Sequence, residues 1–359
     1  MINVTRPYLP EKETFDRLVA GVWERNWLTN NGPLVNELEL KIKEYLHIDH
    51  LLFVTNGTIA LQIAIKALNL KGEIITTPFS YVATTSSIVW EGCEPVFVDI
   101  DPLTFNLDPS RLEEAITPRT TAILATHVFG NPCAIETIDE ISNRYGLKVI
   151  YDNAHGFGVK YKRKSLFSYG DVSTASFHAT KIFHTIEGGA VTTRNPELLK
   201  TLAFMRNFGH NGPDDFAMVG INGKNSELHA AMGLSILPDI SQIIASRKRA
   251  CEHYTERLKN LHISYQQINS EAEWNYSYFP ILFLTEQSLL KAIKALNENC
   301  IYPRRYFYPS LSSLRYVKGK ITPVADDISR RILCLPLYVG LSMEEIDFVA
   351  RILLRCQNN

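Results

Sequence analysis

The sequence predicts an α/β protein with a mainly parallel central sheet flanked by helices, followed by a smaller C-terminal α/β domain. Three observations support this prediction. Short β-branched runs alternate with helix-like stretches between residues 51 and 193. The pattern changes after about residue 238, and a chain of 359 residues is long enough for about two domains. We therefore expect a large domain over 1–238, with an N-terminal arm, and a small domain over 239–359.

Seven short apolar segments are the strand candidates of the large domain. They cover residues 51–55, 73–77, 95–99, 121–126, 147–152, 172–177 and 190–193. Between them lie stretches with apolar residues at helical spacing, such as 58–68 and 135–145. Strands that alternate with helices predict βαβ units and a parallel sheet, in which ligands bind at the carboxyl ends of the strands. The chemistry should therefore lie in the loops that follow the strands.

The C-terminal part contains fewer and more scattered elements. The sequence predicts a helix over 239–261, a strand over 278–284 and a terminal helix over 342–356. This combination indicates a second, smaller α/β unit, with a boundary near Pro238.

Composition and charge exclude several classes of function. The 37 basic and 38 acidic side chains form no long run of one sign, which argues against a nucleic-acid partner. No segment reaches the length of apolar sequence that a membrane span needs, and no signal peptide is apparent. The six cysteines include no C-x-x-C pair, so neither a disulfide framework nor a metal site follows. We expect a cytoplasmic protein.

Two loops after strand candidates carry groups that suit a planar, anionic ligand. In TNGTIAL, Gly57 and Thr58 lie where a strand turns into a helix, and a helix N-terminus favours an anion. The alternative is a plain turn with Thr58 as the helix cap. In TPFSYVATTSS, Phe79 or Tyr81 could stack on a flat ring, or could be a core aromatic at the end of a strand.

Two further loops supply a carboxylate and an amine. In YDNAHGFG, Asp152 ends an apolar strand, where a carboxylate needs a partner such as a pyridinium nitrogen; a helix cap or a structural ion pair are the alternatives. In STASFHATK, Ser176 could bind the same anion as Gly57, and Lys181 could attack a carbonyl to form a Schiff base. A lone lysine is ordinarily a solvated charge. The occurrence of all four features on successive loops favours a cofactor site.

Taken together, these motifs resemble those of a known family. TNGTIAL, SYVAT, YDNAHGFG, SFHATK with EGG, and GINGKNSELHAAMG are similar to successive motifs of the DegT/DnrJ/EryC1/StrS family. Its members are fold-type I, pyridoxal-phosphate-dependent aminotransferases that act on nucleotide-linked keto sugars. The resemblance implies that Lys181 binds pyridoxal 5'-phosphate covalently, Asp152 pairs with the pyridinium nitrogen and Tyr81 stacks on the ring.

The resemblance also implies roles for other cofactor-binding residues. Gly57, Thr58 and Ser176 would hold the cofactor phosphate, and His155 would hydrogen-bond to the ring hydroxyl. Asn222 would reach the phosphate in a neighbouring subunit, which implies a homodimer with shared active sites. Two positions depart from the family pattern: Lys224 replaces a common arginine, and Asn153 replaces a small residue.

The family's chemistry implies a transamination with L-glutamate as the amino donor. Of the sugars used in the family, we favour dTDP-4-dehydro-6-deoxy-D-glucose, which would become dTDP-4-amino-4,6-dideoxy-D-glucose, a deoxysugar of the kind found in O-antigen and lipopolysaccharide. The alternatives are a C3 aminotransferase acting on a dTDP-3-keto sugar, a pyridoxal-phosphate-dependent sugar dehydratase, and a non-catalytic regulatory relative. The dehydratases carry a histidine in place of the lysine, which is present here as Lys181.

Substrate contacts are the least defined part of the prediction. The aromatic and basic run over 301–311 could bind a diphosphate and a hexose, or could be a packed edge of the small domain. The residues that we predict to line the sugar pocket are Asn30, Gly32, His184, Glu187, Arg304 and Tyr308.

Overall fold

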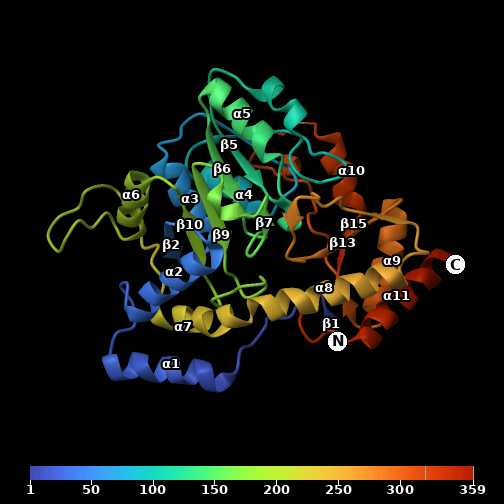
Figure 1. Ribbon diagram of the computed structural model, residues 1–359. Coiled ribbons are helices and arrows are strands. Elements are labelled where there is room, and N and C mark those ends of the chain that lie inside the picture. Colours follow the sequence, from blue (N-terminus) through green and yellow to red (C-terminus); the bar gives the residue numbers. More distant parts are fainter. Residues whose placement is uncertain (320, 359) are drawn as a thin grey trace.

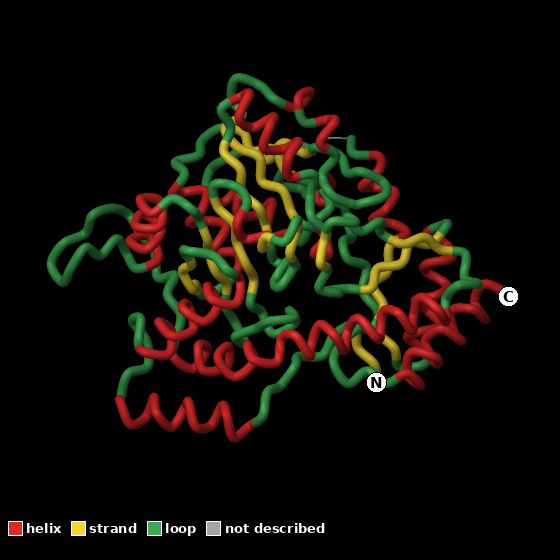
Figure 2. The backbone as a smooth tube through the Cα atoms, viewed as in Figure 1, coloured by secondary structure: helices red, strands yellow, loops and turns green. Residues whose placement is uncertain are grey.

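A seven-stranded sheet forms the centre of the protein, seen in a computed structural model that describes residues 1–319 and 321–358 (Figures 1 and 2). Its strand order is β2-β10-β9-β6-β5-β3-β4. Neighbouring strands pair in parallel except β10, which runs antiparallel to both β2 and β9. The strands are β2 (Leu51–Val54), β3 (Glu73–Thr76), β4 (Glu94–Phe97), β5 (Thr120–Thr126), β6 (Lys148–Asp152), β9 (Val172–Ser176) and β10 (Gly189–Thr192).

All seven predicted strands are therefore confirmed, and all belong to one sheet. Helices cover both of its faces, as expected for parallel strands joined by crossovers (Figure 2). Along β2, Phe53 packs with α2 and α7, whereas Leu52 and Val54 face α3. The large-unit helices are α1 (Lys12–Arg25), α2 (Pro33–Leu46), α3 (Gly57–Ala67), α4 (Val82–Trp90), α5 (Ile135–Tyr145), α6 (Pro196–Arg206) and α7 (Glu227–Ile236).

The C-terminal part builds its own core around a second sheet. Strands β11 (Ile263–Tyr265), β13 (Phe279–Phe283) and β15 (Ile332–Leu335) pair antiparallel. Its helices are α8 (Ile240–Arg257), α9 (Glu286–Glu298), α10 (Pro323–Arg331) and α11 (Met343–Asn358). A third small sheet joins β12 (Ala272–Glu273) to β7 (Lys160–Tyr161) and β8 (Lys164–Ser165), so the two parts also share strands.

The first residues of the chain pair and pack with elements of the C-terminal part. Strand β1 (Ile2–Asn3) pairs in parallel with β14 (Ile301–Tyr302). Ile2 is buried in the same apolar cluster as α8, α9 and α11. Backbone pairing at a strand edge and the burial of Ile2 therefore hold the N-terminus beside residues that are distant from it in the sequence.

A long helical run crosses the predicted boundary at Pro238. It joins α7 to α8 through a short 3₁₀ turn over Leu237–Asp239 and lies along one side of the molecule (Figure 1). Ile240 and Ile243 pack in the core of the large unit, whereas Ala250 and Tyr254 pack in that of the small unit. We therefore propose that the division falls inside α8.

The same run, Glu227–Arg257, is long and apolar enough in composition to cross a bilayer. In the protein its apolar side chains face other elements instead. Helix α7 contacts α1 and α2, and α8 contacts α11, so the run serves as a core helix that is shared by both units.

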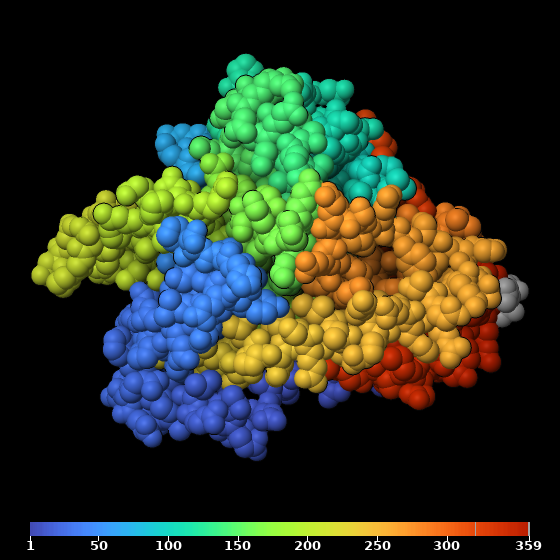
Figure 3. Space-filling view, in the orientation of Figure 1, coloured from blue at the N-terminus to red at the C-terminus, as the bar shows by residue number. Residues whose placement is uncertain are grey.

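The loop between α6 and α7 projects from the body of the protein (Figures 1 and 3). It exposes four large apolar side chains, whose exposed fractions are highest for Val219, at 77%, and Phe216, at 61%. Phe208 and Ile221 are also exposed. Asn222, the residue that we expect to act in a neighbouring subunit, lies in this loop.

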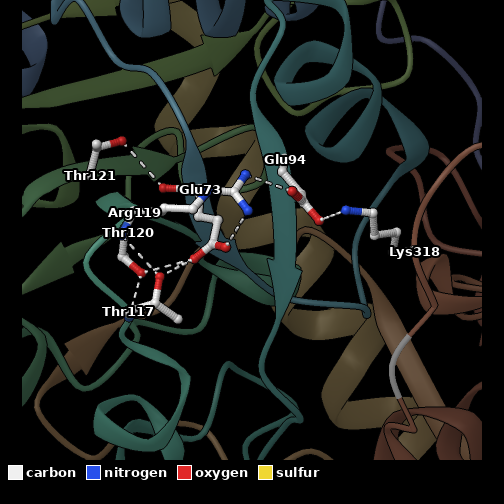
Figure 4. Close-up of polar contacts among 7 residues, drawn as sticks. All are labelled: Glu73, Glu94, Thr117, Arg119, Thr120, Thr121 and Lys318. Carbon is white, nitrogen blue, oxygen red and sulfur yellow. Dashed lines mark hydrogen bonds and ion pairs between the residues drawn. The ribbon is translucent and has the colours of Figure 1, made fainter.

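A polar network fastens the sheet to the loop that precedes α10 (Figure 4). Arg119 forms ion pairs with Glu73, at the start of β3, and with Glu94, at the start of β4. Glu94 also accepts a hydrogen bond of 2.7 Å from Lys318. The buried Glu73 carboxylate also accepts a hydrogen bond from Thr117 Oγ1. The amino edge of the sheet, opposite the loops predicted to carry chemistry, is thus held by charge pairs.

A buried carboxylate holds the start of α2. Glu227, which is fully buried at the start of α7, accepts hydrogen bonds from the backbone N–H groups of Leu34 and Val35. These donors have no partner within their own helix, and the helix dipole favours an anion there. A Cβ atom on Gly32 would lie 2.5 Å from the Glu227 carboxyl carbon, so this glycine leaves room for the carboxylate.

We predict that Glu227→Ala lowers the free energy of unfolding by about 2–4 kcal/mol, because two buried N–H groups lose their acceptor. Urea denaturation followed by circular dichroism measures this change. The matched control is Glu37→Ala, since Glu37 is exposed on α2 itself. Equal stability of the two variants would contradict a capping role for Glu227.

Candidate active site

The loops after β2, β3, β6 and β9 enclose a cavity of about 290 Å³ at the carboxyl edge of the sheet. Strand order explains the convergence, because these four strands point the same way. The cavity brings together eight of the residues predicted from the sequence: Gly57, Thr58, Tyr81, Asp152, His155, Ser176, Lys181 and Glu187.

One end of the cavity is suited to an anion. Helix α3 begins there, and its first N–H groups, those of Gly57 and Thr58, have no acceptor within the helix. Asn56 caps the helix by accepting a hydrogen bond from Ile59 N, so the alternative of Thr58 as the cap is wrong. A Cβ on Gly57 would approach the Ser176 Cβ to 2.9 Å. Glycine therefore keeps this end open.

Asp152 is buried at the end of β6 with both oxygens facing donors. Its Oδ2 accepts a hydrogen bond from Thr84 Oγ1 at 3.0 Å, and its Oδ1 accepts one from Ala154 N at 3.0 Å. Burial raises the pKa of the carboxyl, and the two hydrogen bonds and the nearby Lys181 oppose this rise. A positively charged N–H group in the cavity would stabilise the carboxylate further.

His155 is held as a neutral imidazole. Its Nδ1 accepts a hydrogen bond from Phe129 N at 3.1 Å, so the proton lies on Nε2. Burial and, to a smaller extent, the charge of the nearby Lys181 lower the pKa of the imidazole well below its ordinary value. The ring stacks on Phe307, with centroids 5.7 Å apart. Nε2–H is the donor that remains for a ligand.

Of the two aromatic candidates after β3, only Tyr81 reaches the cavity. Its side chain is 60% exposed and lines the cavity at the start of α4. Phe79 is fully buried and packs edge-on against Phe105, Phe129 and Phe307. Tyr81 thus offers a free flat face, and Phe79 is a core residue.

Lys181 is partly buried at the floor of the cavity. Burial lowers the pKa of its amine to about 8, and the coulombic attraction of Asp152 opposes this shift. Nζ donates a hydrogen bond to the phenol oxygen of Tyr278 at 3.4 Å. A substantial neutral fraction at moderately alkaline pH makes this lysine a nucleophile, which the other cavity residues surround.

The residues that we predicted to contact substrate differ in whether they line the cavity. Glu187 lines the cavity mouth, with a carboxylate oxygen 3.6 Å from Nε2 of His178. Asn30 and Gly32 lie in the turn before α2 and do not line the cavity. His184 is buried: its Nε2–H donates to the carbonyl oxygen of Tyr8, and its Nδ1 accepts from Ile186 N. Both ring nitrogens of His184 are thus used within the protein, and its side chain does not line the cavity.

The segment 301–311 lines the cavity with side chains other than the two that we predicted. Arg304 is exposed, and its backbone pairs with Cys334. The Tyr308 ring lies 3.5 Å from the guanidinium of Arg305, outside the cavity. Tyr306 and Phe307 line the cavity instead. The predicted segment therefore reaches the cavity, but through other side chains than Arg304 and Tyr308.

Other cavity residues were missed altogether. Thr84 and Asn56 belong to the quoted motifs SYVAT and TNGTIAL, and their hydroxyl and amide groups were the available signals. Tyr278 begins the predicted strand 278–284, and nothing in that pattern indicated that it lines the cavity. Asn222 lies outside the cavity of its own chain and accepts a hydrogen bond from Lys224 Nζ.

Comparison with known proteins identifies the family. Residues 10–354 match the sequence profile of the DegT/DnrJ/EryC1/StrS aminotransferase family. The chain belongs to this family. It is an aminotransferase, as the motifs indicated. A family member from Shigella dysenteriae, named dTDP-4-amino-4,6-dideoxy-D-glucose transaminase, is 42% identical over 358 residues, which cover 97% of each chain.

Solved structures of similar proteins confirm the fold-type I prediction. DesI, determined in the presence of its TDP-sugar product, superposes with a TM-score of 0.94 at 31% identity, covering 99% of this chain and 92% of DesI. NtdA from Bacillus subtilis, with the cofactor PMP bound, superposes with a TM-score of 0.89 at 28% identity, covering 97% of this chain and 82% of NtdA. The family depends on pyridoxal phosphate.

We predict that Lys181→Met stabilises the cofactor-free protein by on the order of 3 kcal/mol below pH 8. The folded-state pKa, about 8, lies below the ordinary value of 10.5, so the unfolded chain binds more protons between these values. The native protein then gains stability as pH rises from 8 to 10.5, and the advantage of the variant shrinks. Thermal unfolding across this range measures the difference.

The matched control is Lys71→Met, since Lys71 is exposed. This control should show no advantage that depends on pH between 8 and 10.5. A constant difference between Lys181→Met and the native protein over that range would argue against a depressed pKa.

Proposed function

We propose that the protein transfers the amine of L-glutamate to C4 of dTDP-4-dehydro-6-deoxy-D-glucose, giving dTDP-4-amino-4,6-dideoxy-D-glucose, with pyridoxal 5'-phosphate as cofactor. The observation that carries the chemistry is the presence of Lys181, Asp152 and His155 in one cavity next to the N-terminus of α3. The relative that is 42% identical over nearly the whole chain supports the choice of sugar.

The cavity residues fit this cofactor. An anion site formed by Gly57, Thr58 and Ser176 would hold the phosphate, and the open space left by Gly57 is consistent with that role. Asp152, whose pKa burial raises, would bind the protonated ring nitrogen. Bound pyridoxal phosphate supplies an electron sink that stabilises negative charge on the substrate carbon.

Four further side chains would then carry out the remaining tasks. Lys181 would hold the cofactor through its aldehyde carbon and, once released, carry a proton to and from the substrate carbon; a pKa of about 8 suits both tasks. His155 would donate its Nε2–H to the ring hydroxyl, and Tyr81 would cover one face of the ring. Glu187, which lines the cavity, would accept hydrogen bonds from sugar hydroxyl groups.

We further propose a homodimer, in which Asn222 reaches the phosphate site of the partner subunit. Its place on a projecting loop with exposed apolar side chains supports this arrangement, because such side chains mark association surfaces. A cytoplasmic location is consistent with nucleotide-linked substrates, and remains part of the proposal.

Lys181 favours transamination over the alternatives. Sugar dehydratases that resemble the family carry histidine at this position, and a non-catalytic regulator would not need a depressed lysine pKa beside a buried carboxylate. A C3 aminotransferase would use the same catalytic residues. Product analysis distinguishes C3 from C4 amination.

We predict that adding L-glutamate to the cofactor-loaded protein replaces the absorbance band of the aldehyde form of the cofactor with that of the amine form. Adding dTDP-4-dehydro-6-deoxy-D-glucose then restores the aldehyde band. NMR of products from a panel of dTDP-, UDP- and GDP-linked keto sugars locates the new amine. No spectral change with glutamate would exclude it as the donor, and an amine at C3 would overturn the proposed regiochemistry.

We also predict that Asp152→Asn lowers kcat by at least about 100-fold, because the ring nitrogen loses its charged partner. Lys181→Ala should abolish borohydride-dependent covalent fixation of the cofactor, measured by mass spectrometry of the intact protein. Fixation in Lys181→Ala at the native level would show that another lysine holds the cofactor. Near-native turnover by Asp152→Asn would refute the role of the carboxylate.

A further inference from the structure

Tyr278 is the side chain that contacts Lys181 from the C-terminal part of the chain. It precedes β13, and its phenol oxygen lies 3.4 Å from Lys181 Nζ. The same nitrogen lies 5.9 Å from the centroid of the Tyr278 ring. Tyr278 therefore presents both an acceptor and an aromatic ring to the amine.

The segment that carries Tyr278 is fixed by buried hydrogen bonds. The Arg247 guanidinium donates to the carbonyl oxygen of Tyr276 at 2.9 Å and to that of Ser277 at 2.6 Å. The Asn275 amide donates to the carbonyl oxygen of His155 at 2.8 Å. Asn275 and Arg247 are both nearly fully buried, so these bonds are shielded from water.

The ring of Tyr278 is confined by other aromatic rings. His155 lies edge-on at 5.0 Å between centroids, Tyr306 edge-on at 5.6 Å, and Phe129 at 5.3 Å. A ring held by several neighbours on a fixed backbone has little freedom to turn. The position of its oxygen relative to Lys181 is set by the fold.

We propose that Tyr278 is a positioning residue for Lys181: its phenol oxygen accepts the hydrogen bond from Nζ, holds the amine at the cavity floor and stabilises its protonated form. The proposal rests on the proposed role of Lys181 as the cofactor lysine. A hydrogen bond from a charged donor is roughly twice as strong as one from a neutral donor, so the phenol oxygen favours the ammonium over the amine. Burial acts in the opposite direction, and the balance keeps the proton exchangeable near the working pH.

Several titratable groups besides Tyr278 face this part of the cavity. Asp152 lies at the end of β6, His155 in the loop after it, Tyr81 at the start of α4 and Tyr306 in the segment 301–311. His178 and Glu187 lie at the mouth of the cavity. Changing Tyr278 to phenylalanine leaves all of them in place. A change in the protonation of Lys181 in that variant therefore reports on the phenol oxygen.

The test measures the protonation of Lys181 directly in the full-length, cofactor-free protein. Acetic anhydride acylates only the neutral amine, and mass spectrometry of the Lys181 peptide at a series of pH values gives the midpoint. We expect Tyr278→Phe to lower this midpoint by about half a unit to one unit. Tyr254→Phe is the matched control: Tyr254 is a fully buried tyrosine of the small-unit core whose hydroxyl has no partner among the described residues.

A second variant separates positioning from simple packing. Asn275→Ala leaves Tyr278 intact but removes a bond that fixes its segment, so the midpoint should move in the same direction by a smaller amount. Thermal unfolding confirms that each variant is folded. A native midpoint in Tyr278→Phe would overturn the proposal.

The labelling reaction contains no cofactor, glutamate or sugar. Its result is therefore independent of whether the protein performs the proposed transamination. A shifted midpoint without transaminase activity would leave the positioning role standing and reject the proposed function, and the reverse pattern would do the opposite.

Discussion

The convergence of strand ends is the constraint on which the whole structure depends. Because β2, β3, β6 and β9 point the same way, their following loops meet at one edge. A helix N-terminus, an aromatic ring, a carboxylate and a lysine thereby come together from residues more than a hundred positions apart. Both faces of the sheet are covered by helices, so the strands have no freedom to slide. The packing of the core therefore determines the geometry of the site.

Within that geometry, burial acts on two opposite charges at once. It raises the pKa of the Asp152 carboxyl and lowers that of the Lys181 amine, while the attraction between the two groups opposes both shifts. The protein thus holds two groups in states that cost stability, as is common where function requires reactive side chains. A ligand that carries a positive charge near Asp152 and a carbonyl near Lys181 would relieve both costs together.

The sequence was informative where local pattern and chemistry agree. Alternating apolar runs were enough to predict all seven strands of the main sheet. Asp152 ended an apolar strand, and Lys181 was singled out because it occurred on successive loops with Asp152, an aromatic residue and a helix N-terminus. The sequence was less informative where tertiary packing decides the direction of a side chain or the pairing of distant segments. Whether the side chain of Tyr306 or that of Tyr308 points into the cavity depends on contacts with rings that are distant in the sequence. His184 forms a hydrogen bond with the backbone carbonyl oxygen of Tyr8, which is also distant in the sequence. The pairing of β1 with β14 joins residues some 300 positions apart, which no local pattern encodes.

The pairing of β1 with β14 also makes the chain cross between its two units a second time. One crossing is the rigid helical run of α7 and α8, and the other is the extended segment between β1 and α1, whose Tyr8 binds Asp239 through its hydroxyl and the His184 ring through its carbonyl oxygen. Two crossings at separate points resist twisting of one unit against the other far better than a single hinge. The N-terminal segment thereby acts as a strap that passes beside the lysine loop, and cutting it would loosen that loop without touching a residue of the cavity.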